Sequence, residues 1–87
     1  MKVSVWDTYV TKKDGAIMHF DILVAESEKE ERKILGYGKA YLKSKGQEGQ
    51  SLTSKECNFC HLENAAGEIA LSINERGHYI VEMQGCQ

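Results

Sequence analysis

Proline is absent from this chain of 87 residues, and no apolar run approaches the ~18 residues that a membrane-spanning helix needs. A proline-rich linker or ligand motif is therefore excluded, and no membrane segment is expected. An excess of one charge is also missing, since 11 basic and 13 acidic side chains leave a net charge of −2. This balance argues against a general nucleic-acid-binding protein, which needs a basic surface.

The chain is short enough to predict a single domain over residues 1–87, with one core and little room for a deep catalytic cleft. No export signal is expected at the N-terminus, because Asp7 interrupts the apolar run and no small-residue cleavage site follows. We therefore expect a cytoplasmic protein. In a reducing compartment, an odd count of three cysteines favours thiol, metal or packing roles over disulfides.

Two segments rich in β-branched and aromatic residues, 2–11 and 16–24, flank an Asp-Gly pair at 14–15. An Asp-Gly pair in this position predicts a β-hairpin. Placing Thr11 opposite Ala16 collects nearly all the aliphatic side chains on one face, as a half-buried sheet requires.

The second face of this predicted hairpin is mixed rather than polar, so it needs a covering layer or a partner. We expect a homodimer joined through this face, around Trp6, Ile17 and Leu23. In the same register Asp7 breaks the pattern, since it falls among the aliphatic side chains, opposite Phe20. A loop cap or a bulge at Asp7 is the plainer explanation.

The rest of the chain predicts two helices and two further strands. A capping box at Ser27-x-x-Glu30 begins the first helix, and Gly36 and Gly38 inside it predict close contact with a sheet. The remaining elements are a first helix over 27–45, a possible strand around the cysteine segment 57–63, a helix over 65–76 that ends at Gly77, and a strand over 78–83. The order β-β-α-β-α-β predicts an α+β domain, with both helices on one face of a mixed four-stranded sheet.

The sequence Cys57-Asn58-Phe59-Cys60-His61 carries the most specific motif, C-x-x-C-H. The motif is the attachment signature of c-type haem, but haem attachment takes place in exported compartments, so haem is disfavoured. A structural zinc ion is a better candidate, because it takes four N or S ligands. The predicted zinc set is Cys57, Cys60, His61 and Cys86, with His78 or His19 as substitutes.

Two other interpretations of the cysteines stay open. A redox C-x-x-C normally begins a helix, whereas here Glu56 and Glu63 flank the motif with negative charge. Free cysteines can equally be small buried hydrophobic residues. Outside this segment, His19 and Asp21 share a strand face and form a candidate acid–base pair, while Asp7, the third member of this polar set, points to the other face in the predicted register.

Several stretches resemble a small bacterial family, the domain of unknown function numbered two thousand and twenty-four. The resemblance covers nearly the whole chain and rests on WDTYVTKKDG, MHFDILV, YLKSKGQEGQ, LTSKECNFCH and the closing Met83-x-Gly-Cys86. It implies a compact α+β fold with no established activity, and it speaks against haem while leaving zinc open. Its recurrent residues correspond to Trp6, Asp7, His19, Asp21, Cys57, Cys60, His61 and Cys86.

Three functions are compatible with these patterns. The first is a non-enzymatic binding or interaction domain. The second is a metal-dependent or thiol-dependent protein that uses the C-x-x-C-H cluster. The third is a small hydrolase or isomerase that uses His19 and Asp21, which would need a cavity lined by those side chains.

Overall fold

The computed structural model describes all 87 residues and begins with the predicted hairpin. Strands β1 (Lys2–Thr11) and β2 (Ile17–Ala25) pair antiparallel, which confirms the hairpin. Its register is one residue away from the predicted one. Because the Lys12 amide donates to the Ala16 carbonyl at 2.8 Å and Gly15 takes a φ of 88°, the loop has three residues and Thr11 lies opposite Ile17.

A shift of one residue moves every side chain of one strand to the opposite face relative to the side chains of its partner strand. In the observed pairing, Asp7 lies opposite Asp21 and not opposite Phe20. Even-numbered side chains of both strands share one face, and odd-numbered side chains share the other. Asp7, His19 and Asp21 therefore lie on the same face, which corrects the prediction that Asp7 points away from the other two.

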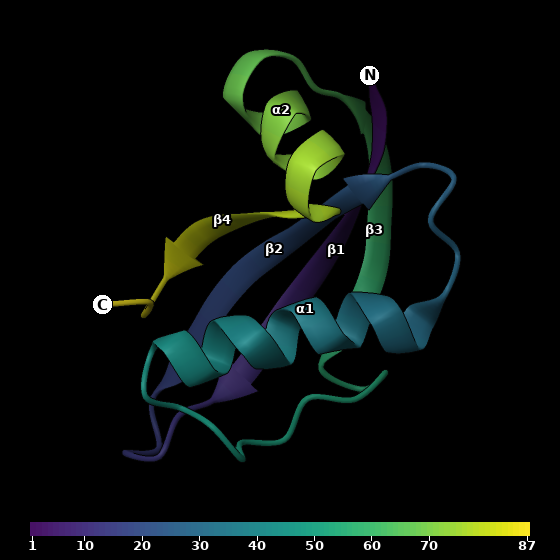
Figure 1. Cartoon of the computed structure of the whole chain (residues 1–87). Coiled ribbons are helices and arrows are strands. Elements are labelled where there is room, and N and C mark those ends of the chain that lie inside the picture. The colour runs from purple at the N-terminus through teal and green to yellow at the C-terminus, as the bar shows by residue number, and fades with distance from the viewer.

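Four further elements complete the domain: α1 (Glu31–Ser44), β3 (Cys57–Asn64), α2 (Gly67–Arg76) and β4 (Tyr79–Gln84). The four strands form one sheet in the order β3-β1-β2-β4 (Figure 1). The α+β class and the order β-β-α-β-α-β are confirmed. Every neighbouring pair is antiparallel, so the sheet is not mixed as predicted.

The helices cover opposite faces of the sheet, whereas the sequence predicted both on one face. The main core lies between α1 and the even-numbered strand residues: Val10, Met18, Phe20, Ile22 and Val24 with Ile34 and Leu42 of α1. A smaller cluster lies under α2 on the odd-numbered face: Val3, Val5 and Leu23 with Ile73. Because α2 is short and covers only one end of its face, the other end of that face is left open (Figure 1).

Helix α1 starts later than predicted and contacts the sheet through one glycine. The predicted capping box is not formed, since the N-cap residue Glu30 makes no side-chain cap and Ser27 lies outside the helix. A Cβ at Gly38 would lie 2.6 Å from Leu52 Cδ2 and 3.0 Å from Ile22 Cδ1, so Gly38 provides the predicted close contact. Gly36 has nothing within 4 Å of its Cβ position and provides none.

The surface expected to join two copies does not exist as a single face. Trp6 lies on the α1 side of the sheet, whereas Ile17 and Leu23 lie on the α2 side. The homodimer itself stays a prediction. Neither helix is both long enough and apolar enough to cross a membrane.

Candidate functional site

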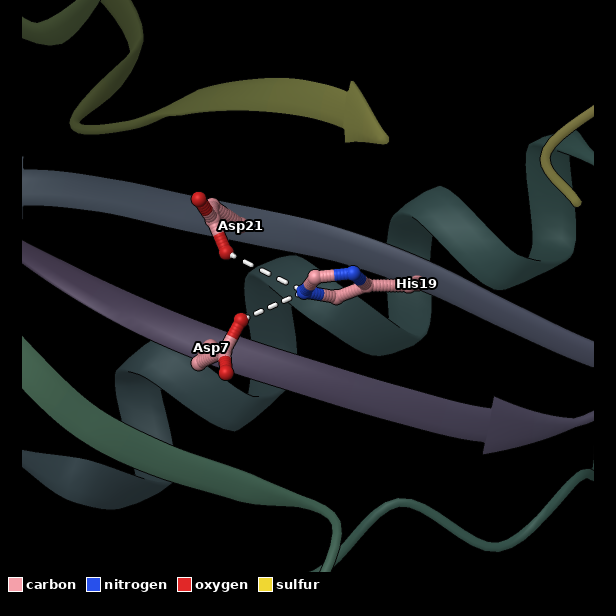
Figure 2. Close-up of side chains that lie close together, drawn as sticks. All are labelled: Asp7, His19 and Asp21. Carbon is pink, nitrogen blue, oxygen red and sulfur yellow. Dashed lines mark hydrogen bonds and ion pairs between the residues drawn. The ribbon is translucent and has the colours of Figure 1, made fainter. Parts of the chain in front are cut away.

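Three polar side chains converge on the open part of the face that α2 leaves uncovered. Asp7 of β1 lies directly opposite Asp21 of β2, and His19 lies two residues from Asp21 on the same face. One potential ligand atom from each of Asp7, His19 and Asp21 lies within 4.8 Å of the other two. Figure 2 shows both carboxylates pointing at the imidazole from neighbouring strands. We call these three residues the carboxylate–histidine site.

The contacts inside this site are unequal. His19 Nε2 lies 2.5 Å from Asp7 Oδ1, a short hydrogen bond, and 3.7 Å from Asp21 Oδ1, which is beyond hydrogen-bond length. The side chains of His19 and Asp21 are each 17% exposed, and that of Asp7 is 34% exposed. Asp21 Oδ1 is buried and has no hydrogen-bond partner, the one buried side-chain polar atom of the chain in this condition.

The two carboxyl groups titrate differently because their surroundings differ. Burial raises the pKa of Asp21 to about 6, and the neighbouring Asp7 carboxylate adds to the effect. Burial is the largest single influence on Asp7 and opposes its ionisation, but hydrogen bonds with His19 and Asp21, together with the nearby imidazole charges, outweigh burial and hold the pKa of Asp7 below its ordinary value. Asp21 therefore holds its proton only below about pH 6, and near neutral pH both carboxylates are charged and would be stabilised by a cation.

Two contacts fix the position of His19. The Tyr9 ring stacks on the imidazole, with centroids 4.1 Å apart and planes at 11°. On the other side of the backbone, the Cys86 thiol donates a hydrogen bond to the His19 carbonyl at 3.3 Å. Stacking on Tyr9 and the hydrogen bond with Asp7 orient the imidazole ring, while the Cys86 contact holds the backbone at His19.

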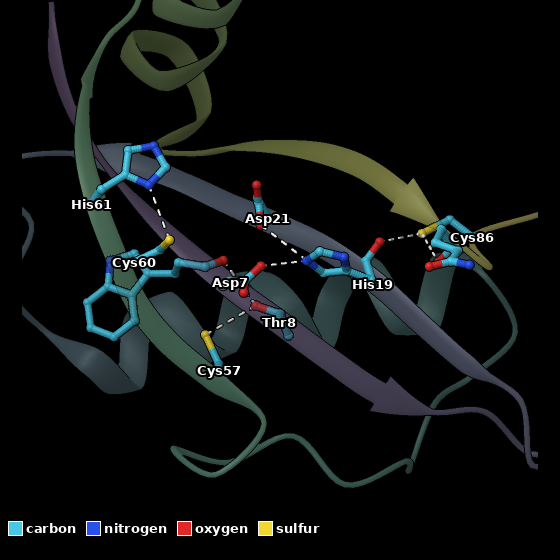
Figure 3. A network of polar contacts seen from close by, with 10 residues as sticks. Asp7, Thr8, His19, Asp21, Cys57, Cys60, His61 and Cys86 are labelled. Carbon is cyan, nitrogen blue, oxygen red and sulfur yellow. Dashed lines mark hydrogen bonds and ion pairs between the residues drawn. The ribbon is translucent and has the colours of Figure 1, made fainter.

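The four residues of the predicted zinc set are not brought together. Cys57 points into the core below α1, where it accepts a hydrogen bond from Thr8 Oγ1 at 3.3 Å. Cys86 follows β4, which lies at the opposite edge of the sheet from β3, so strands β1 and β2 lie between it and the C-x-x-C segment (Figure 3). Only Cys60 and His61 are in contact, at 3.2 Å.

The C-x-x-C-H segment forms an edge strand and not a helix N-terminus, so the thioredoxin-like arrangement is not present. Burial raises the pKa of the Cys57 thiol, which suits a packing role. Glu63 was not predicted as a site residue, yet its Oε1 lies 2.9 Å from His61 Nε2. Spacing could have indicated this contact, since residues two apart on a strand share a face.

The surface has four cavities, and none is lined by Asp7, His19 or Asp21. The largest, of ≈ 540 Å³, lies between the C-terminal part of α1 and residues 48–53. The carboxylate–histidine site is consequently a partly buried cluster on the sheet surface and not part of a cavity wall.

Comparison with known proteins places this fold in one family. Residues 1–83 match the family model described as Domain of unknown function (DUF2024), which confirms the resemblance noted in the sequence. The NMR structure of protein NE1680 from Nitrosomonas europaea, a Northeast Structural Genomics Consortium target, is 41% identical, covers 100% of both chains and gives a TM-score of 0.85. No curated protein matches the chain. Neither description names a ligand or a reaction.

Proposed function

This chain belongs to the DUF2024 family, and we propose that it is a binding domain for a divalent metal ion held by Asp7, His19 and Asp21. The observation that carries the proposal is the convergence of three ligand atoms of suitable type, all within 4.8 Å of one another, on one face of a rigid hairpin. The proposal gives a specific ligand class to the non-enzymatic binding domain that the sequence predicts.

The spacing of the donors supports a single ion. Ligands at about 2.1 Å from a metal lie roughly 3.0 to 3.5 Å from one another. The measured separations from His19 Nε2, 2.5 Å to Asp7 and 3.7 Å to Asp21, bracket that range. Small side-chain rotations would therefore place the ion where a proton now bridges His19 and Asp7.

The energetics of the free site favour a cation. Two carboxylates directly opposite each other on paired strands destabilise a sheet, and burial of Asp21 adds to the cost. A divalent ion would neutralise both charges and would give Asp21 Oδ1 the partner that it lacks. Strain of this kind in an otherwise well-paired sheet is common at functional sites.

The donor set narrows the choice of ion. Carboxylates suit Mg²⁺, Ca²⁺ and Mn²⁺, whereas imidazole suits transition metals and Zn²⁺. Two carboxylates with one imidazole therefore favour Mn²⁺, Fe²⁺ or Zn²⁺ over Mg²⁺ or Ca²⁺. The remaining coordination positions would face solvent, because the site lies on an open surface.

The same open surface supports ion binding over the hydrolase or isomerase alternative. An enzyme that uses His19 and Asp21 needs a cavity to hold and orient its substrate, and the four cavities lie elsewhere. Acid–base chemistry at these residues would also leave Asp21 Oδ1 without an assigned partner.

Titration calorimetry tests the proposal. Chelator-treated protein at neutral pH is titrated with Mn²⁺ and with Zn²⁺, and one ion should bind per chain. His19→Ala and Asp21→Asn should each abolish the heat of binding, because each removes one of three ligands. Asp14→Asn is the matched control, since Asp14 is an exposed turn residue far along the hairpin from the site.

Cys60→Ala separates this site from the zinc set predicted in the sequence. Binding that survives Cys60→Ala but is lost in Asp21→Asn supports the carboxylate–histidine site. Wild-type protein that binds neither ion, or Zn²⁺ binding lost in Cys60→Ala and intact in Asp21→Asn, would refute the proposal.

A further inference from the structure

A β-bulge in β3 changes the direction of one cysteine side chain. Along the β1–β3 pairing, Val5 lies opposite His61 but Trp6 lies opposite Phe59, so Cys60 is the extra residue. In a regular strand, consecutive side chains point to opposite faces. The bulge breaks that alternation, and Cys60 Sγ lies 3.2 Å from Nδ1 of the next residue, His61. Figure 3 shows the sulfur and the imidazole facing each other.

A carboxylate completes this arrangement. Glu63 Oε1 lies 2.9 Å from the far ring nitrogen of His61, Nε2. The three groups therefore form a chain of thiol, imidazole and carboxylate along one edge strand. A nucleophile within reach of a base, with the base oriented by a third group, is the arrangement that activates a weak nucleophile.

This group is accessible from solvent, unlike the other two thiols. Cys60 is exposed, and the side chains of His61 and Glu63 are 50% and 52% exposed. Cys57 and Cys86 are buried, and each is engaged in a hydrogen bond within the fold. The chain thus has one exposed thiol beside an imidazole, and two buried thiols that serve as internal controls.

We propose that Cys60 is a peroxide-reactive thiol, with His61 as its proton acceptor and Glu63 as the residue that positions the imidazole. The assignment uses no residue of the carboxylate–histidine site, although the His61 charge lies near enough to favour the ionised forms of Asp7 and Asp21. The substrate class is a small hydroperoxide, and the modified form is the sulfenic acid of Cys60.

The reaction balances with these groups alone. His61 takes the thiol proton, and the Cys60 thiolate attacks one oxygen of the O–O bond. An S–O bond forms as the O–O bond breaks, so the sulfur is oxidised by two electrons and the peroxide is reduced. The leaving hydroxide or alkoxide takes the proton back from His61, which gives Cys60–SOH and water or an alcohol.

Because His61 can accept the thiol proton and then return it, the arrangement favours a hydroperoxide over a disulfide as the reactant. A disulfide releases a thiolate, which leaves without a proton, whereas a hydroperoxide releases a much more basic oxyanion. An imidazole that has just accepted the thiol proton can supply it to that oxyanion. With Cys57 pointing into the core, no second cysteine lies ready to condense with the product, so the sulfenic acid awaits an external thiol.

The test follows the rate of sulfenic acid formation in the full chain. Metal-free protein with chelator present is treated with hydrogen peroxide and dimedone, and the labelled cysteines are identified by peptide mass spectrometry. We expect labelling at Cys60, with Cys57 and Cys86 unlabelled. His61→Ala should slow labelling about fivefold, the size of effect that one exposed ion pair has on the thiolate population.

Two further variants distinguish a role of His61 as proton acceptor from a purely structural role. Added imidazole should restore the rate of His61→Ala, whereas it should not change that of Glu63→Gln, which is slowed but keeps its own ring. Asn58→Ala, an exposed change on the same strand, should react at the wild-type rate. Equal rates in wild type and His61→Ala, or labelling of Cys57 as fast as Cys60, would overturn the assignment.

Discussion

Replacement of Asp21 by asparagine should have two opposite effects, and together they test the account of the site. Without metal, Asp21→Asn should raise the free energy of unfolding at pH 8, because it removes a buried carboxylate placed opposite another carboxylate. With Mn²⁺ or Zn²⁺ present, the variant should lose the stabilisation that the wild type gains. If Asp21 served folding alone, Asp21→Asn would lower the free energy of unfolding both without and with metal.

The magnitude follows from the pKa of Asp21. Each tenfold change in proton affinity is worth about 1.4 kcal/mol, so the difference between the ordinary value of 3.8 and about 6 sets an upper limit of about 3 kcal/mol. Solvent near this open face screens the interaction, which leaves roughly 1 to 2 kcal/mol. For a domain of this size, that corresponds to a rise in Tm of roughly 5 to 10 °C.

The pH dependence has a definite sign. Between pH 3.8 and about 6 the folded protein keeps the Asp21 proton that the unfolded chain has already released. The contribution of this group to stability therefore falls as the pH rises through that window. The advantage of Asp21→Asn should be near zero at pH 4 and complete above pH 6.

Thermal and urea unfolding of wild type, Asp21→Asn and the control Asp14→Asn measure these effects. At a metal concentration a hundred times its Kd, the wild type should gain about 2.7 kcal/mol and the variant nothing. Metal-free Asp21→Asn that is less stable than the wild type at pH 8 would contradict a destabilising carboxylate at position 21. Equal stabilisation of Asp14→Asn would contradict it as well.

Three other substitutions test the surroundings of the site and the core. Asp7→Asn should lower the pKa of Asp21 from about 6 toward its ordinary value, because it removes the neighbouring charge. Carboxyl carbon NMR measures this pKa, and an unchanged value would show that Asp7 does not contribute to the raised pKa of Asp21. In urea unfolding, Gly38→Ala should destabilise the domain by about 1 to 2 kcal/mol, since its Cβ would overlap Leu52. Gly36→Ala on the same helix should instead stabilise the domain by up to about 1 kcal/mol, because its Cβ would meet nothing within 4 Å. Equal effects of the two glycine substitutions would contradict the described contact between α1 and its neighbours.

The sequence predicted the hairpin but not its register, and the site depended on the register. The Asp-Gly pair located the turn, yet it did not say whether the loop had three residues or four. The backbone of Gly15 decides this, and one residue moves Asp7 to the other face. In the predicted pairing the Asp7 carboxylate lay among aliphatic side chains, opposite Phe20. That conflict correctly indicated an error in the predicted register.

For the cysteine motif, the sequence predicted a shared site, but the fold separates its residues. Its spacing suggested one metal site, but the antiparallel sheet places Cys57 in the core and Cys86 at the far edge. A bulge, which spacing does not reveal, then brings Cys60 and His61 together on the surface. Local patterns therefore predicted the elements, while strand order and register decided which side chains meet.

Paramagnetic NMR with Mn²⁺ would locate the bound ion on the sheet, because an 87-residue chain allows every amide to be followed. Substoichiometric Mn²⁺ should broaden the amide signals around Asp7 on β1 and around His19 and Asp21 on β2, with the effect falling off along both strands. Broadening centred instead on residues 57–61 or on Cys86, or spread evenly over the acidic surface, would contradict a metal site between the two central strands.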